Sequence, residues 1–248
     1  MNSDLPAQAR AVIIGGGIAG ASVAYHLTKL GWKDVILLEQ NKIGGGTTWH
    51  AAGMVGRLRT TTSMTRINQA SCDLYAGLEK ETGHSIGWKP VGSLIVASSE
   101  DRMIQLRRTC AMAELMGVEA HLIGADECFE RWPLIRKDDL LGGAWLPHDG
   151  KVIPKEVPLA LGKAAVKRGA KILEGVRVTN IEHRDGRATG VVTDQGTTKA
   201  EFVVITGGMW ARELGLRAAW SRRSDARRDT TAGSRRNADP VRAPTCRR

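Results

Sequence analysis

"VIIGGGIAGASVAYHLTKLGWKDVILLE", residues 12–39, decides the fold class of this chain. A short β-branched run, Val12 to Ile14, meets a cluster of glycines, and apolar residues then recur at helical spacing until Gly31. Val35 to Leu38 is a second continuous apolar run, which is typical of a strand buried on both faces of a parallel sheet. The stretch therefore predicts a strand, a glycine turn, a helix and a second strand.

The glycines of this turn form a G-x-G-x-x-G motif, Gly15, Gly17 and Gly20. The first allows a tight turn, the second a close backbone approach to a pyrophosphate, and the third close packing of helix on strand. The helix N-terminus favours an anion, because its N–H groups are free and its dipole is positive there. Glu39, at the end of the second strand, is placed to accept hydrogen bonds from both ribose hydroxyls and would repel the 2′-phosphate of NADP. The motif predicts a dinucleotide site without choosing between FAD and NAD, and a structural turn without a ligand is the alternative.

Helices and strands alternate along the rest of the chain, and this pattern predicts an α/β fold. The expected helices span about residues 62–83, 100–116 and 154–168. The expected strands are 92–99, one within 140–150, a long one over 170–183, and a hairpin that ends in a return strand, 202–206.

Composition and charge narrow the classes of partner. The chain is 42% hydrophobic and 25% charged, which is ordinary for a soluble globular protein, and no apolar run is long enough for a membrane helix. The net charge of +10 is concentrated at one end, since residues 219–248 hold nine arginines against three aspartates. We therefore expect neither a nucleic-acid nor a membrane partner. The four cysteines have no metal-ligand spacing, which favours a reducing, cytoplasmic location and no metal site.

"GGGTTWHAAGMVG", residues 44–56, follows the second strand and returns to the cofactor side of the predicted sheet. Small residues surround Trp49 and His50, and they would let a flat ring lie against the backbone. Position and composition together favour contact with a ligand over a loop whose histidine faces water.

The glycine unit and "GTTWHAAGM", with "KPVGSL", "ERWPL", "HDG", "RVTNI" and "GGMWARELG", resemble the dimethylglycine and sarcosine dehydrogenase-like flavoproteins of the D-amino-acid oxidase superfamily. The resemblance covers roughly residues 10–216. It implies an FAD-binding, Rossmann-like domain of the GR2 or D-amino-acid oxidase type, formed by residues 1–85 and 150–216. Residues 86–149 would be part of an inserted, incomplete α+β substrate domain.

The resemblance also implies a set of FAD contacts. His50 stands where family members attach FAD covalently, through an imidazole nitrogen and the 8α-methyl of the flavin. Ile18 and Ala19 would lie under the pyrophosphate, and Gln40 would join Glu39 at the ribose. The expected cofactor-binding residues are Gly15, Gly17, Ile18, Ala19, Gly20, Glu39, Gln40, Gly46, Thr47, Thr48, Trp49, His50, Ala51, Ala52, Gly53, Met54, Val178 and Trp210. No residue is assigned as a catalytic base.

The implied activity is oxidative N-demethylation of a small N-methylated amino acid such as dimethylglycine or sarcosine, with an electron acceptor or a folate as a further partner. Family members continue beyond residue 216, so the chain is expected to be C-terminally truncated. The arginine-rich segment, residues 217–248, is expected to be disordered, and a shifted reading frame is one hypothesis for it. The alternatives are a non-covalent FAD amino-acid oxidase, a non-catalytic remnant and a basic nucleic-acid-binding fragment.

Overall fold

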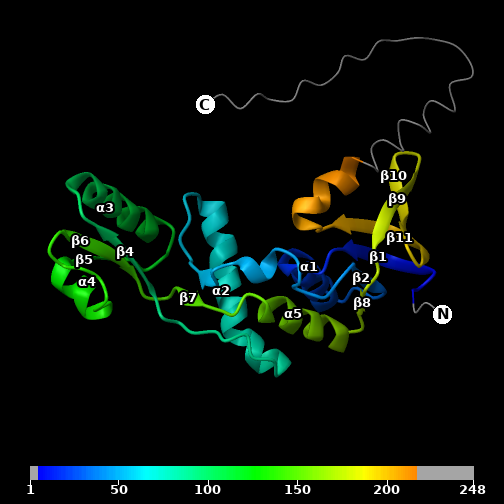
Figure 1. Ribbon diagram of the computed structural model, residues 1–248, viewed down its shortest axis with the longest axis horizontal. Helices are drawn as coiled ribbons and strands as arrows, with labels where there is room; N and C mark the ends of the chain where they lie inside the picture. Colours follow the sequence, from blue (N-terminus) through cyan, green and yellow to red (C-terminus); the bar gives the residue numbers. More distant parts are fainter. Residues whose placement is uncertain (1–4, 217–248) are drawn as a thin grey trace, which may run out of the picture.

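The computed structural model describes residues 5–216. The arginine-rich segment, with the expectations of disorder and of a shifted frame, lies outside these residues. The described chain forms an elongated molecule with a larger lobe around a six-stranded sheet and a smaller lobe around a three-stranded sheet (Figure 1).

The six-stranded sheet has the order β8-β2-β1-β11-β10-β9. The first four strands are parallel, and β10 and β9 continue the sheet in antiparallel fashion. The strand bounds are β1 Gln8–Ile14, β2 Val35–Glu39, β8 Lys171–Glu174, β9 Val178–Arg184, β10 Arg187–Thr193 and β11 Gly196–Ile205. The central strand β1 thus pairs with β2 on one side and with β11, which is remote in sequence, on the other.

Alternate side chains of the central strands bury opposite faces of this sheet. Ile13 and Leu37 face helices α1 (Ile18–Lys29) and α5 (Glu156–Lys167), with Ala24 and Ala165 in the same buried cluster. On the other face Val12, Ile14, Ile36 and Leu38 pack with Ile181 and Val191 of the β9–β10 hairpin. Both faces are therefore covered, as the two continuous apolar runs predict.

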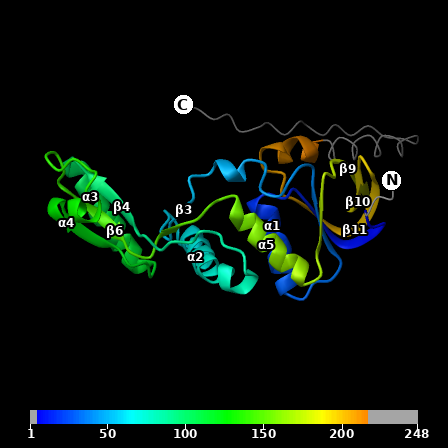
Figure 2. The same cartoon turned by 60° about the horizontal axis from the view of Figure 1, so that its bottom comes forward.

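The smaller lobe lies within residues 86–149, the range expected for the inserted domain. Its antiparallel sheet has the order β4-β6-β5, and helices α3 and α4 pack on it (Figure 2). A long helix, α2, and a short antiparallel pair, β3 with β7, lie between the lobes. The bounds are β3 Met54–Val55, α2 Thr62–Thr82, β4 Ser93–Ala97, α3 Glu100–Leu115, β5 His121–Gly124, α4 Ala125–Arg131, β6 Gly142–Leu146 and β7 Gly150–Lys151.

The three expected helices are present, and α2 illustrates why. The Thr61 hydroxyl accepts from the Met64 N–H at its start, and Gly83 ends it with φ +67°. The single long strand expected over 170–183 is wrong, because the chain turns at Gly175 with φ +74° and divides it into β8 and β9. The return strand is longer than expected, while β5 and α4 are additional elements. No helix among residues 5–216 is both long and apolar enough to cross a membrane.

Candidate functional site

A cavity of about 280 Å³ opens at the carboxyl ends of β1, β2 and β11. Eleven of the sequence-predicted contacts line it: Gly15, Gly17, Ile18, Ala19, Glu39, Gln40, Gly46, Thr47, Thr48, Val178 and Trp210. Open α/β sheets bind ligands at this edge. The volume lies near the lower end for ligand pockets, which suits one half of a dinucleotide better than the whole.

Two positions of the glycine turn, Gly15 and Gly20, admit only glycine. Gly15 has φ +107°, and a Cβ there would lie 2.7 Å from the Thr206 carbonyl oxygen. A Cβ on Gly20 would lie 1.9 Å from the Gly15 carbonyl oxygen, so Gly20 serves the packing of α1 and does not line the cavity. The Thr206 hydroxyl donates to the carbonyls of Ile14 at 2.8 Å and Gly15 at 3.1 Å, which fixes the turn against β11.

The first turn of α1 faces the cavity as an anion site. The N-cap residue, Gly17, has no side chain that could accept from the N–H groups of this turn. The turn also contains no acidic residue. The Ile18 N–H donates to the Thr48 hydroxyl at 3.1 Å. Because that hydroxyl accepts here, its own hydrogen can be donated to a ligand oxygen. Backbone N–H groups, a hydroxyl donor and the helix dipole thus converge on one point.

Glu39 ends β2 at the rim of the cavity and already holds two backbone amides. Its Oε2 accepts from the Gly16 N–H at 2.6 Å, and its Oε1 accepts from the Asn41 N–H at 2.8 Å. Sequence analysis assigned only ribose hydroxyls to this carboxylate. An ionised carboxylate has about four acceptor positions, so the two assignments are compatible. Glu39 therefore shapes the glycine turn as well as offering acceptors to a ligand.

The outer wall comes from residues that are remote in sequence. Val178 begins β9, and Trp210 closes the short helix η2 (Gly208–Trp210). A Cβ on Gly46 would lie 3.7 Å from the Trp210 ring, an ordinary van der Waals distance, so Gly46 and the indole lie side by side in this wall. The lining residues that sequence analysis missed are Ile14, Leu38, Asn41, Gly45, Val176, Arg177, Thr206, Gly207, Gly208, Ala211, Glu213 and Leu214. Six of these twelve are adjacent in sequence to a predicted residue, and that proximity is the available signal for them: Ile14, Leu38, Asn41, Gly45, Arg177 and Ala211.

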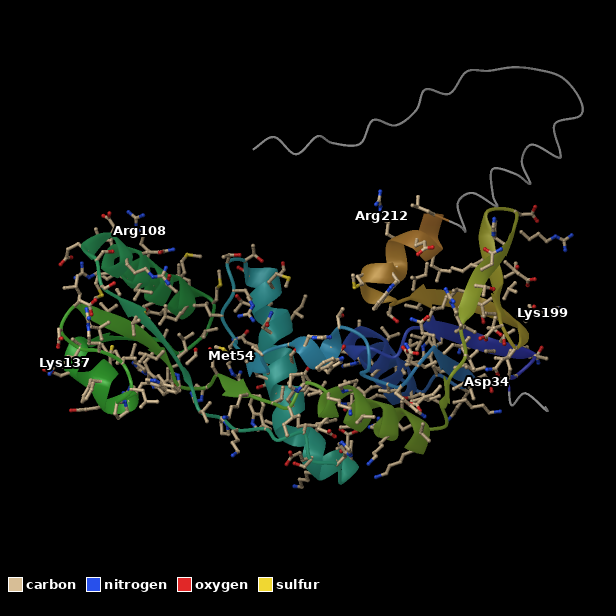
Figure 3. All side chains as sticks on the ribbon, in the orientation of Figure 1. Asp34, Met54, Arg108, Lys137, Lys199 and Arg212 are labelled. Carbon is tan, nitrogen blue, oxygen red and sulfur yellow. The ribbon has the colours of Figure 1, made fainter. Side chains whose placement is uncertain are left out.

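The remaining predicted FAD contacts, from Trp49 to Met54, lie outside the cavity. Trp49 and His50 lie on the short helix η1 (Thr48–His50), with ring centroids 3.7 Å apart and planes inclined at 32°. Among the described residues the His50 ring has no hydrogen-bond partner. Trp49 is 52% exposed and Met54 is 74% exposed, and Met54 lies beside α2 between the two lobes (Figure 3). Ala51 and Ala52 are exposed and Gly53 is buried, and none of the six residues from Trp49 to Met54 lines the cavity.

Gly53 has a structural reason for its identity. Its φ is +81°, and a Cβ would lie 2.3 Å from the Val152 carbonyl oxygen. The Val152 N–H donates to the Gly53 carbonyl at 2.9 Å. The glycine thus brings the loop against the strand that returns from the smaller lobe.

The described residues fit the ADP portion of FAD. Glycines occupy the places where a Cβ would fill the turn, the helix end offers N–H donors, and Glu39 offers acceptors. The fit concerns this half of the cofactor, because the Trp49–Met54 stretch lies outside the cavity.

Comparisons with known proteins agree with this geometry. The model of the family "FAD dependent oxidoreductase" (DAO) matches residues 10–231. The mitochondrial pyruvate dehydrogenase phosphatase regulatory subunit of Mus musculus is 39% identical over 86% of this chain, and the mitochondrial sarcosine dehydrogenase of Homo sapiens is 36% identical over 86%. The chain spans 24% of the length of each of these relatives.

Among solved structures, L-proline dehydrogenase from P. horikoshii superposes with a TM-score of 0.82 at 29% identity, covering 87% of this chain and 57% of that one. The resemblance inferred from the motifs is therefore confirmed, as is the mixed α/β fold with a D-amino-acid oxidase-type FAD-binding domain. The chain belongs to the FAD dependent oxidoreductase family, DAO.

Proposed function

We propose that this chain forms the FAD-binding part of a flavoenzyme that oxidises the CH–NH bond of small N-methylated amino acids. The observation that carries the proposal is the cavity at the glycine turn, with Trp49 and His50 directly after its lining residue Thr48. A 36% identical relative is named sarcosine dehydrogenase, which supports this substrate class. Sarcosine and dimethylglycine are the substrates to test first.

The proposal gives a binding role to backbone groups and to four side chains of the cavity. The N–H groups at the start of α1 and the Thr48 hydroxyl hold the diphosphate. Glu39 accepts from the adenosine ribose, and Val178 and Trp210 flank the adenosine. FAD, when bound, supplies the hydride acceptor for the N-methyl carbon. The protein's contribution is to fix the position and orientation of that acceptor.

His50 is the residue proposed to tether FAD, through an imidazole nitrogen. The support is its place two residues beyond Thr48, on the turn that leaves the cavity, and a ring without a hydrogen-bond partner among residues 5–216. The alternative is a site that holds FAD without a covalent bond. Its expected behaviour differs in a way that is simple to observe.

The test is reconstitution of the 248-residue chain with FAD, followed by absorbance spectra before and after acid precipitation. The tether predicts yellow colour in the precipitate and a flavin-modified His50 peptide by mass spectrometry. His50→Ala should release its flavin into the supernatant, whereas His26→Ala, on the exposed side of α1, should retain the adduct. Yellow wild-type protein that loses all of its colour to acid would favour the non-covalent alternative.

The substrate proposal is tested by dye reduction and formaldehyde release with sarcosine and dimethylglycine. Oxidation of an N-methyl group gives an iminium, and its hydrolysis gives the demethylated amine and formaldehyde. A folate could take up that one-carbon unit, and a separate protein could accept the electrons. Formaldehyde production matched to dye reduction supports the proposal. Dye reduction without formaldehyde would contradict it, because the hydride would then come from the α-carbon of the amino acid and hydrolysis would release methylamine or dimethylamine instead. The three described free thiols, Cys72, Cys110 and Cys128, accord with the proposed reducing, cytoplasmic location.

A second candidate function is regulatory and non-catalytic. A relative that is 39% identical is named as the regulatory subunit of a phosphatase, so the same fold can carry a role other than turnover. This candidate predicts FAD binding without reduction of the bound flavin by any methylated glycine under anaerobic conditions. Bleaching of the flavin absorbance by sarcosine would exclude it.

A further inference from the structure

Two carboxylates end neighbouring parallel strands side by side. Glu39 of β2 and Glu174 of β8 are register partners, at the edge of the sheet where the cavity opens. Glu39 lines the cavity, whereas Glu174 does not. The sequence motifs predict a ligand contact for Glu39 and none for Glu174.

Glu174 holds the loop that follows β2. Its Oε1 accepts from the Ile43 N–H at 2.8 Å, and its Oε2 accepts from the Lys42 ammonium at 2.7 Å. The Glu174 side chain is 31% exposed, while the Lys42 side chain is 82% exposed. A backbone amide held by a partly covered carboxylate is the stronger of the two anchors, since exposed ion pairs contribute little.

The anchored segment leads directly into the cavity wall. Ile43 is buried, and the next residue, Gly44, donates its N–H to the Gly16 carbonyl at 2.9 Å. Gly44 has φ +71°, so this step of the backbone has a defined shape. Four residues later the Thr48 hydroxyl meets the Ile18 N–H. Glu174 thus acts on the anion site through a short, continuous stretch of chain.

We propose that Glu174 is a positioning residue for FAD binding, acting through Ile43 on the loop Gly44–Thr48. The inference rests on the proposed function, because it assumes that FAD occupies this cavity. The Lys42 hydrogen bond, followed by the Ile43 N–H, lowers the pKa of the Glu174 carboxyl, so the group is ionised at neutral pH. In this proposal the Glu39 carboxylate contacts the ligand, and the Glu174 carboxylate holds the loop.

Three variants separate the anchors. Glu174→Ala removes both bonds, Glu174→Gln keeps an acceptor for the Ile43 N–H, and Lys42→Met removes only the ion pair. Glu201→Gln is the matched control, because Glu201 lies on the same sheet and pairs with Arg10 at 3.5 Å, away from the cavity. The measurements are the FAD dissociation constant, the Tm of the apoprotein and amide hydrogen exchange of residues 40–48.

We expect Glu174→Ala to raise the FAD dissociation constant roughly tenfold, the order expected for one charge-assisted hydrogen bond. Glu174→Gln should restore binding to within about threefold of wild type, and Lys42→Met and Glu201→Gln should bind as wild type. In the apoprotein, exchange at Ile43 and Gly44 should accelerate in Glu174→Ala alone.

Each outcome decides the proposal. Wild-type FAD affinity in Glu174→Ala overturns it, and so does a loss of affinity that Glu174→Gln fails to restore and that follows the fall in Tm. If the wild-type chain binds no FAD, the proposed function fails. Exchange at residues 43–44 then still decides whether Glu174 holds the loop.

Discussion

The two halves of the loop after β2 differ in how they are held. Gly44 to Thr48 is bonded to the glycine turn at both ends, through the Gly16 carbonyl and the Ile18 N–H, and most of it lines the cavity. Trp49 to Met54 leaves the cavity, and it presents an indole and a thioether to solvent, while Gly53 is buried against Val152. The half of the loop that is proposed to bind the diphosphate is therefore fixed by bonds to the glycine turn, whereas the half that is proposed to meet the flavin is not.

Gly20→Ala is expected to have the largest effect on stability and FAD binding, because it disrupts the glycine turn to which Gly44–Thr48 is bonded. A Cβ only 1.9 Å from the Gly15 carbonyl forces α1 away from the turn. We expect a loss of about 3 kcal/mol in the free energy of unfolding and no measurable FAD binding. Urea unfolding and FAD titration measure both quantities.

Gly77→Ala is the matched control for this variant. Gly77 also lies in a helix, but a Cβ there meets nothing within 4 Å. The control should be stabilised by about 0.5–1 kcal/mol. Equal stability of the two alanine variants would refute the close packing of α1 on the turn.

Glu39→Ala comes next, because it removes acceptors for Gly16, Asn41 and the ribose together. Sequence analysis alone predicts weaker FAD binding with an intact fold. The two amide bonds add a loss of stability, and each bond to a charged group is worth roughly 1.5–3 kcal/mol at most. We therefore expect both a lower urea midpoint for the apoprotein and weaker FAD binding. Unchanged flavin retention would remove Glu39 from the site.

Thr48→Val tests the end of the fixed half with nearly the same side-chain shape. The Ile18 N–H loses its acceptor, and the diphosphate loses a donor. We expect FAD affinity to fall by about 1 kcal/mol, with little change in the Tm. Thr48→Ser retains the hydroxyl and should bind like wild type. Similar affinities for the valine and serine variants would show that the hydroxyl makes no contact with the ligand.

A smaller effect is expected on the pH dependence of stability when Glu174 is replaced by glutamine. The pKa of Glu174 is lowered in the folded state, chiefly by the Lys42 hydrogen bond, so its contribution to stability is present above the ordinary glutamate range. That contribution is lost as the pH falls through the lowered pKa. Glu174→Gln should flatten the acid limb of the pH–stability curve between about pH 5 and pH 3. Superimposable curves for the two proteins would contradict this assignment.

Trp49→Ala is expected to have the smallest effect on the apoprotein, since the ring is half exposed and its described ring contact is with His50. The free energy of unfolding should change by less than about 1 kcal/mol. The same variant should reduce flavin incorporation, because the indole belongs to the half of the loop proposed to meet the flavin. A large loss of stability would mean that this half is as firmly held as the first.

The sequence predicted the part of the fold that rests on local rules. Glycine spacing and two apolar runs predicted β1, α1 and β2 correctly, because a tight turn and a doubly covered sheet each require particular residue types. The break at Gly175 was missed, since a glycine inside an apolar pattern is compatible with either a bulge or a turn.

The sequence likewise predicted only those residues of the candidate site that belong to local motifs. Glu39 and Thr48 could be placed from motif and loop position, whereas Thr206 and Glu174 take their roles from tertiary contacts with residues far away in sequence. The hydroxyl of Thr206 and the carboxylate of Glu174 bond to backbone atoms that any residue would offer. The pattern of residue types in the sequence therefore does not indicate which backbone atoms Thr206 and Glu174 bind.

The pairing of β1 with β11 has a consequence for folding. The Thr206 hydroxyl bonds to the Gly15 carbonyl across 191 residues, and the parallel register of the two strands spans a similar separation. Contacts between such distant segments form slowly, because closing the intervening chain is entropically costly. During synthesis the apolar strand Ala11–Ile14 must therefore remain without one of its two neighbours until β11 emerges. The segment that carries the nucleotide-binding motif is thus also the one most in need of protection by chaperones before the sheet closes.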